Sequence, residues 1–391
     1  MLSPRVPHDY SPNEITKLLL AKRRAGAEIL DLTESNPTRA GLPGAGTAEL
    51  QALADPRAAR YDPDPRGLPA AREAIARYYA ERAGAPGGES PVGPDDLVLA
   101  ASTSEAYAHL FRLLCEPGEE VLAPRPSYPL FEPLASLEGI KVETYRLDYA
   151  SGWRLDLDSL KAAAGSRTRA LILVQPNNPT GSCLGAEEIA RVEEICAARR
   201  IALISDEVFG DYAWPPAKAP LPSLTGPRGA LTFVLSGLSK LCGMPQMKLA
   251  WIAVQGPSAA RREALEGLEW IADLFLSVGT PVQWALPRLL KARSGFHGRV
   301  MRRLAANLDR LRGPGNGTPG LGVLGGDGGW SAVVSASGSE PDFALRALRD
   351  RDVLLHPGHY YELANDSLGV LSLLPEPSTF DEALKRLESL P

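Results

Sequence analysis

Short, mostly apolar runs recur through the middle of the chain, and segments with helical spacing separate them. The runs lie at residues 97–100, 120–123, 141–144, 170–174, 201–205 and 231–235. Helical patterns cover residues 104–115, the neighbourhood of 131, 157–164 and 186–199. Apolar strands that alternate with helices predict a mostly parallel sheet covered on both faces. In such α/β sheets, ligands bind at the carboxyl ends of the strands.

Both flanks of this central series predict further elements. Before it, helices are expected at 13–25, 47–54 and 69–83 and a strand at 29–32; after it, helices follow at 258–275, 282–292 and 296–312. A glycine-rich linker at 313–329 leads to an α+β tail, with strands from 330, 352 and 370 and helices at 342–349 and 380–390. We expect an N-terminal arm with part of the small domain at 1–45, a large domain at 46–290 and a small C-terminal domain at 291–391.

Composition narrows the class of protein. Hydrophobic residues make up 44% of the 391 residues, charged residues 23%, and the net charge is −5, which argues against a nucleic-acid partner. The apolar cluster Leu18–Ala21 is too short for a signal peptide or a membrane span. The four cysteines are scattered, which suggests neither a zinc site nor disulfides: Cys115, Cys183, Cys196 and Cys242. We expect a soluble, cytoplasmic protein without a membrane partner.

One lysine has an unusual position. Lys240 lies in a tight Ser-Gly-Leu-Ser-Lys turn between two strongly apolar runs in the segment 231–253. An ammonium held there loses hydration, so its pKa falls and its neutral amine becomes a nucleophile able to form a Schiff base. The alternative is a lysine that extends from a strand end into solvent.

Three other stretches favour the nucleophile. Residues 174–181 end one predicted strand with a rigid polar loop, and Asp206 ends the next strand. The stretch Ser102–Tyr107 lies where a helix begins, and free backbone amides and hydroxyls at such a position bind phosphate. A phosphate, a lysine and a carboxylate together suggest one cofactor.

These stretches carry a resemblance to a known family. The sequence resembles the fold type I pyridoxal-phosphate enzymes and, within them, the class I/II aminotransferases, over nearly the whole chain. The markers are Asn177–Gly181, Asp206–Phe209, the Ser239–Lys240 pair and Gly243–Pro245, in that order. The resemblance implies an α/β fold in which a mostly parallel seven-stranded sheet covered by helices forms the large domain, beside a smaller α+β domain. It also implies pyridoxal 5′-phosphate as the cofactor.

The resemblance assigns roles to individual residues. Lys240 matches the lysine that holds the cofactor as an internal aldimine and moves the proton, and Asp206 matches the carboxylate that pairs with the pyridinium nitrogen. Asn178 matches the asparagine at the cofactor's phenolic oxygen, with a cis peptide bond before Pro179. Tyr128 matches the aromatic residue that stacks on the pyridine ring.

Further matches concern the cofactor's phosphate. Ser102, Thr103 and Ser104 match the phosphate-binding residues, together with Ser239. Tyr61 falls where the family has a tyrosine that reaches into the neighbouring subunit's phosphate site, which implies a homodimer with shared active sites. The alternative for Tyr61 is a tyrosine that packs against its own turn.

Two cofactor contacts depart from the family pattern. Phe209 stands where a tyrosine usually donates to the phenolic oxygen, and a phenyl ring has no donor. Lys248 stands where an arginine usually grips the phosphate; it supplies the charge but not the bidentate geometry. Both residues remain candidates for the cofactor site.

A third departure concerns the substrate. The family holds the substrate α-carboxylate with an arginine in a late strand, and Val370 occupies that place, with no arginine between Arg351 and Arg386. The loop with Ser35 and Asn36 matches one near the carboxylate. Arg39 follows that loop, and our hypothesis is that Arg39 binds the carboxylate; the alternative is a solvated loop arginine.

A histidine pair near the C-terminus needs a separate interpretation. His356 and His359 flank a Pro-Gly turn, and no carboxylate or third histidine is nearby in sequence, so we expect no metal site. Tyr360 or Tyr361 is expected to line the substrate pocket, and Tyr360 is our choice.

The expected function is that of a pyridoxal-phosphate-dependent aminotransferase. It would move an amino group from an amino acid or related primary amine to a 2-oxo acid acceptor. The rival within the same fold is an enzyme that does not transaminate, a β-eliminating lyase or a cyclase. A third hypothesis is a protein that binds the cofactor without catalysis. The presence of both Lys240 and Asp206 argues against it.

Overall fold

The structure is a computed structural model that describes residues 3–84, 90–217, 221–313, 321–336, 342–363, 365 and 367–388. Part of the predicted glycine-rich linker and the last residues of the predicted closing helix lie outside these ranges. Within them, no helix is long and apolar enough to cross a membrane.

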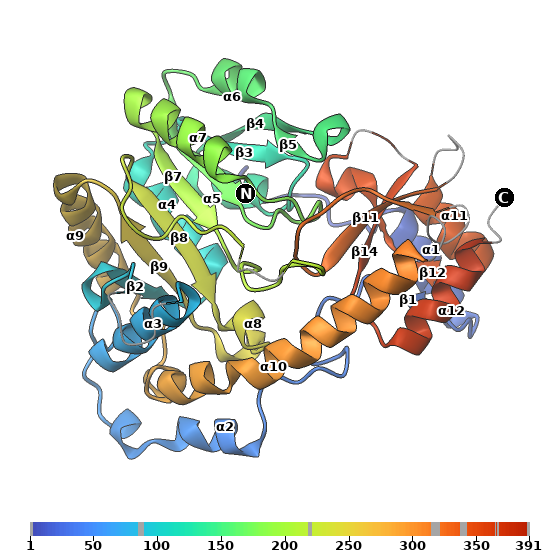
Figure 1. Ribbon diagram of the computed structural model, residues 1–391, viewed down its shortest axis with the longest axis horizontal. Helices are drawn as coiled ribbons and strands as arrows, with labels where there is room; N and C mark the ends of the chain where they lie inside the picture. The colour runs from blue at the N-terminus through green and yellow to red at the C-terminus, as the bar shows by residue number, and fades with distance from the viewer. Residues whose placement is uncertain are drawn as a thin grey trace.

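A large sheet forms the body of the molecule, at the left of Figure 1. Its order is β2-β9-β8-β7-β6-β3-β4-β5, and the run from β8 to β4 is parallel. The strands are β2 (Leu97–Ala100), β9 (Ala250–Gln255), β8 (Thr232–Gly237), β7 (Ala202–Asp206), β6 (Thr168–Val174), β3 (Glu120–Arg125), β4 (Lys141–Asp148) and β5 (Arg154–Leu155). The eighth strand, beyond the seven expected, is the two-residue β5 at the edge.

Helices cover both faces of this sheet, because the strand side chains are apolar on both sides. One buried core joins the sheet to α4 (Thr103–Leu114), α5 (Phe131–Glu138) and α9 (Ser258–Phe275). The other face packs against α3 (Pro69–Arg82), α6 (Leu157–Ala163), α7 (Ala186–Arg199) and the first half of α10 (Thr280–Arg312). The mostly parallel, doubly covered sheet predicted from the sequence is confirmed.

A second, smaller sheet lies at the right of Figure 1. Its antiparallel order is β10-β11-β14-β13, and β1 and β12 form a separate parallel pair beside it. The elements here are β10 (Leu321–Val323), β11 (Ser331–Ala336), β14 (Leu368–Ser372), β13 (His356–Pro357), β1 (Leu30–Asp31), β12 (Val353–Leu354), α1 (Glu14–Arg24), α11 (Phe343–Arg351) and α12 (Pro377–Glu388). Strand β10 lies in the segment that we expected to be only a linker.

Helix α10 connects the two bodies, as its orange ribbon shows in Figure 1. The sequence predicted two helices separated at residues 293–295, and this prediction is wrong: one helix runs for 33 residues. Its buried side chains continue through the expected break, with Leu290 before it and Phe296 after it, so packing outweighs the low helix propensity of Ser294 and Gly295. The expected boundary at 290–291 falls inside this helix, and we propose that the two domains meet within it.

The remaining short elements complete the chain. They are α2 (Thr47–Gln51), α8 (Leu238–Leu241) and 3-10 turns at Ala52–Ala54, Pro56–Ala59, Pro94–Asp96, Tyr149–Ser151, Pro245–Met247 and Gly358–Tyr361. The N-terminal arm before α2 passes very close to the turn after α8. A Cβ on Gly44 would lie 1.9 Å from the backbone oxygen of Cys242, so only glycine fits there.

Candidate active site

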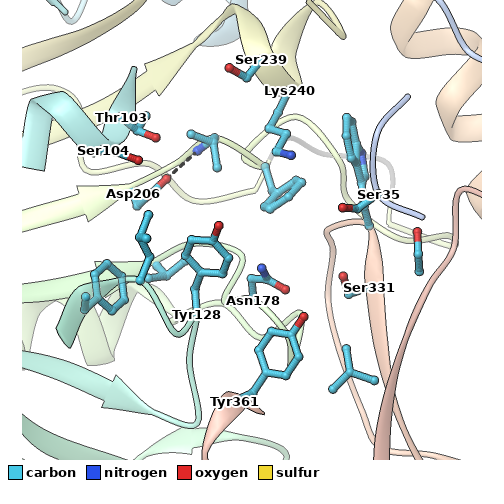
Figure 2. Close-up of a pocket in the computed structure, with 18 of the residues that line it drawn as sticks. Ser35, Thr103, Ser104, Tyr128, Asn178, Asp206, Ser239, Lys240, Ser331 and Tyr361 are labelled. Carbon is cyan, nitrogen blue, oxygen red and sulfur yellow. Dashed lines mark hydrogen bonds between the residues drawn. The ribbon is translucent and has the colours of Figure 1, made fainter. Parts of the chain in front are cut away.

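A cavity of about 350 Å³ lies between the large and small sheets. The carboxyl ends of β6, β7 and β8 supply one side of its lining, and residues of the small sheet supply the other. Figure 2 shows the side chains of Lys240, Asp206, Asn178 and Tyr128 gathered around a common space, with Ser35, Ser331 and Tyr361 at its other side. This is the strand-end position expected for a ligand site.

Lys240 lies in α8, the single turn that follows β8. Its Nζ atom lies 5.5 Å from the centroid of the Phe209 ring and 5.1 Å from that of Trp330. Burial lowers the pKa of Lys240, and the charge of Asp206 opposes that change. Within the described residues no ion pair holds this ammonium, so it faces the cavity with a weakened hold on its proton.

Asp206 ends β7 and also lines the cavity. Its Oδ2 accepts a hydrogen bond from the Tyr107 hydroxyl at 3.1 Å, and its Oδ1 accepts one from the Val208 amide at 3.2 Å. Burial raises its pKa to about 6, although both hydrogen bonds act in the opposite direction. The sequence analysis gave Tyr107 no role. Its position one turn after Thr103, on the same face of the same helix, could have indicated that it lies near the site.

Asn178 and Tyr128 line the cavity beside Asp206. The peptide bond between Asn178 and Pro179 is cis, as expected. The side-chain Oδ1 of Asn178 is buried and has no partner among the described residues, which leaves it available to a ligand. Tyr128 is 44% exposed, and burial followed by the charge of Asp206 raises its pKa.

The first turn of α4 supplies hydroxyl groups to the cavity. Thr103 and Ser104 line it, together with Ser239. Ser102 is not in the lining: its hydroxyl caps the helix by accepting from the Glu105 amide at 3.1 Å. The cap therefore fixes a helix start whose free amides and two hydroxyls suit an anion.

These groups fit pyridoxal phosphate. The lysine suits its aldehyde, the carboxylate suits a ring nitrogen that carries a proton, and the first turn of α4 suits its phosphate. The unpartnered Asn178 oxygen adds a polar contact that the chain itself leaves unused.

Phe209 packs against Trp330 above the lysine. Their ring centroids are 5.3 Å apart at an interplanar angle of 63°, and both rings line the cavity. The indole Nε1 of Trp330 is buried and has no partner among the described residues. Sequence reasoning missed Trp330, since nothing along the chain links the start of β11 to the loop after β7.

The predicted substrate loop contributes only in part. Ser35 lines the cavity, whereas Asn36 accepts a hydrogen bond from the Thr38 amide at 3.0 Å and lies outside the lining. Arg39 also lies outside it: its side chain is 77% exposed, with Nη1 4.0 Å from Glu34 Oε2.

Four residues on one face of the small sheet, which we call the small-sheet wall, line the opposite side: Ser331, His356, Val370 and Ser372. His356 pairs across the strands with Val370, and Ser331 pairs with Ser372. The sequence analysis noted His356 only as a flank of a Pro-Gly turn and gave it no place in the pocket. In the structure it begins β13 and lines the cavity. The wall lies opposite the side formed by Lys240 and its neighbours, which we call the large-sheet wall: Thr103, Ser104, Asn178, Asp206 and Lys240.

Tyr361, rather than the expected Tyr360, lines the cavity. Its hydroxyl lies 2.8 Å from His356 Nδ1. Tyr360 instead accepts a hydrogen bond from Asn13 Nδ2 at 2.5 Å. Within the described ranges, no group of three or more histidine, cysteine, aspartate or glutamate side chains could hold a metal ion.

Two candidate cofactor residues lie away from the cavity in this single chain. Lys248 is exposed, has a left-handed backbone with φ of 53°, and is absent from the lining. Tyr61 is 80% exposed and borders a separate hollow of about 180 Å³ that Gln283 of α10 also lines.

Known proteins resemble this chain in sequence. The family model described as aminotransferase class I and II matches residues 27–387. A glutamate-pyruvate aminotransferase, AlaA, from Escherichia coli is 30% identical over 270 residues, 68% of this chain and 64% of that protein. An alanine aminotransferase from Mycobacterium bovis is 30% identical over 280 residues, 71% of this chain and 63% of that protein. The matched part therefore spans less than two thirds of the length of these relatives.

Solved structures resemble it over nearly all of its length. The alanine aminotransferase from Pyrococcus furiosus is 25% identical, with a TM-score of 0.85 over 99% of this chain and 98% of that one. An aminotransferase from Escherichia coli is 24% identical, with a TM-score of 0.83 over 99% and 97% of the two chains, and supports the shared fold.

Proposed function

Because this chain belongs to the class I and II aminotransferases, a family that depends on pyridoxal phosphate, we propose that it moves an amino group from a primary amine or amino acid to a 2-oxo acid. The observation that carries the proposal is the position of Lys240. Its ammonium faces the cavity beside two aromatic rings, without an ion pair among the described residues, on the same wall as the carboxyl group of Asp206.

The proposed residue roles follow from these positions. When bound, the cofactor supplies the aldehyde that takes up the amino group and the ring that spreads negative charge from the substrate carbon. Lys240 Nζ would accept the proton from that carbon and return it, a task suited to an amine whose pKa is lowered. Asp206 would hold a proton on the ring nitrogen, and Asn178 and Tyr128 would orient the ring. Thr103, Ser104 and Ser239 would bind the phosphate.

The first experiment is an absorbance spectrum of the cofactor-loaded protein from about 300 to 500 nm, before and after addition of primary amines and amino acids. We expect a band above about 400 nm to move to about 330 nm, and a 2-oxo acid to restore it. A band that none of these compounds changes would contradict the proposal.

The lyase rival is supported by Val370, which lines the cavity and which the resemblance puts where the family holds the substrate carboxylate with arginine. Pyruvate and ammonia released from a β-substituted amino acid, without need for a 2-oxo acid, would favour it over transamination.

We also propose a homodimer with shared active sites. It is supported by exposed apolar side chains on one side of α9, with Trp270 68% and Leu274 64% exposed, and by exposed Tyr61. If Tyr61 completes the site of a second copy, a hybrid dimer of one Tyr61→Ala chain and one Lys240→Ala chain has one intact site of two. Hybrids make up about half of an equimolar mixture, so mixing the two nearly inactive variants restores about a quarter of the wild-type activity. If mass spectrometry detects hybrid dimers and mixing still restores no activity, the proposal of shared sites is contradicted.

We also propose a cytoplasmic location. The four cysteines are free, which supports a reducing compartment.

A further inference from the structure

We propose that the small-sheet wall selects a primary amine whose reacting carbon carries an uncharged hydrogen-bonding group, such as a hydroxymethyl group, where an α-amino acid carries its carboxylate. This inference rests on the proposed function and names the substrate class of the same site.

The geometry of two strands supports this choice. His356 of β13 and Val370 of β14 are direct antiparallel partners, so their side chains lie on the same face of the sheet. Both line the cavity, and so does Ser372, two residues after Val370. The wall therefore presents an imidazole, an isopropyl group and a hydroxyl toward the substrate.

The charge balance of the cavity opposes a carboxylate. Among the described lining residues, the single ammonium or guanidinium is that of Lys240, which the chemistry itself requires, and Asp206 adds a carboxyl group. A carboxylate that enters the cavity loses its hydration, and no arginine of the described lining compensates this loss. An uncharged group avoids this cost.

His356 and Tyr361 offer a partner for such an uncharged group. Nδ1 of His356 is engaged with the Tyr361 hydroxyl at 2.8 Å, and Nε2 makes no hydrogen bond to any described residue. Burial lowers the pKa of His356, with Asp31 opposing, which favours the neutral form of the ring. A neutral imidazole nitrogen donates or accepts one hydrogen bond, as a hydroxyl requires.

Arg39 is the alternative residue for binding a substrate carboxylate, and such binding would reverse the preference for an uncharged group. It follows the loop of Ser35, but its side chain is 77% exposed and directed at Glu34, 4.0 Å away. To meet a substrate carboxylate in the cavity, it would have to leave that exposed position and lose hydration.

Matched ligand pairs test the inference on the cofactor-loaded protein. The probes are L-alaninol against L-alanine, L-leucinol against L-leucine and L-phenylalaninol against L-phenylalanine, with dissociation constants from calorimetry and kcat/KM from absorbance. For at least one pair we expect the amino alcohol to bind at least about thirtyfold more tightly, because a buried carboxylate without a partner is penalised. Equal or tighter binding of the amino acid in all three pairs would overturn the inference, and so would no binding of either compound. Loss of amino-acid binding in Arg39→Ala would identify the rival anchor.

A variant sharpens the test. Val370→Arg places a guanidinium at the wall, and we expect it to shift the preference toward the amino acid by tenfold or more. Val370→Met, long but uncharged, is the matched control and should leave the preference with the alcohol. If Val370→Arg does not fold, the wild-type ligand pairs still decide the question.

Binding and turnover separate this inference from the proposed function. Preferential binding of the amino alcohol without any transfer of its amino group would support the proposed substrate class and contradict the proposed aminotransferase activity. Transfer from amino acids alone would support the activity and overturn the substrate class.

Discussion

The two walls of the cavity differ in charge and in their likeness to the family. The large-sheet wall carries an ammonium on Lys240 and a carboxyl group on Asp206, and the sequence resemblance matches both to functional residues of the family. The small-sheet wall carries no aspartate, glutamate, lysine or arginine among its four residues, and the sequence resemblance puts Val370 where the family has an arginine.

This difference indicates how the work of the site is divided. Lys240, Asp206 and Asn178 follow the ends of parallel strands of the large sheet. The small-sheet wall belongs to a separate antiparallel sheet, so its residues are independent of the strands that position the lysine. Family membership therefore fixes the chemistry of this chain far better than its substrate.

Among the tests of the difference between the two walls, Lys240→Ala has the largest expected effect. It removes the side chain that we propose as the proton acceptor, and we expect kcat/KM to fall by about 10³-fold or more. Steady-state kinetics on the preferred amine measures the loss. Lys240→Arg, which keeps a charge but not a usable base, is the control and should be equally impaired. A variant with a tenth of the wild-type activity would show that the lysine is not the base.

The second test is Asp206→Asn, which removes the carboxylate that we propose would pair with the ring nitrogen. We expect kcat to fall by about 10²-fold, because the ring loses the group that keeps it protonated. The same substitution should stabilise the cofactor-free protein. Burial raises the pKa of Asp206 from 3.8 to about 6, so its neutral form stabilises the fold below about pH 4 and this contribution disappears as pH rises through 6.

Urea unfolding of the cofactor-free proteins measures this second effect. At pH 7 the Asn variant should exceed wild type in unfolding free energy by about 1–3 kcal/mol, and the difference should vanish near pH 4. A variant less stable than wild type at pH 7 would show that the carboxylate is stabilised by the site rather than strained in it.

The smallest expected effect is that of Phe209→Tyr, at the border between the walls. A phenol in this position adds the donor that the family usually has, and a donor favours the negative form of the cofactor's phenolic oxygen. We expect the pH midpoint of the cofactor's absorbance band to fall by about one unit, with less than a tenfold change in kcat. An unchanged midpoint, in a variant that binds the cofactor normally, would show that the added hydroxyl points elsewhere. Phe209→Leu is the control for altered packing.

Much of the fold follows from local pattern in the sequence. Helices α7 and α9 begin and end at the predicted residues, because their apolar spacing is regular and because Gly185 and Pro257 mark their starts. The continuity of α10 did not follow, since Leu290 and Phe296 are held by distant parts of the chain.

The residues of the site also fall into those that the sequence predicts and those that it does not. Lys240, Asp206 and Asn178 follow strands and form motifs, so the sequence locates them. His356 and Trp330 reach the cavity only because β11, β13 and β14 pair, and such long-range pairing leaves no local signal. The choice between Tyr360 and Tyr361 depends on the twist of a single 3-10 turn, which neighbouring identical residues cannot reveal.

Gly44 is a position far from the site's motifs at which substitutions are expected to disturb the site. Every missense change of a glycine codon by one base introduces a residue with a Cβ atom, and at this position that atom would lie 1.9 Å from the Cys242 oxygen. The displaced backbone would be the turn that presents Lys240, two residues earlier. A laboratory screen for loss of function should therefore recover substitutions at Gly44 as well as substitutions at the lysine itself, although this glycine does not line the cavity.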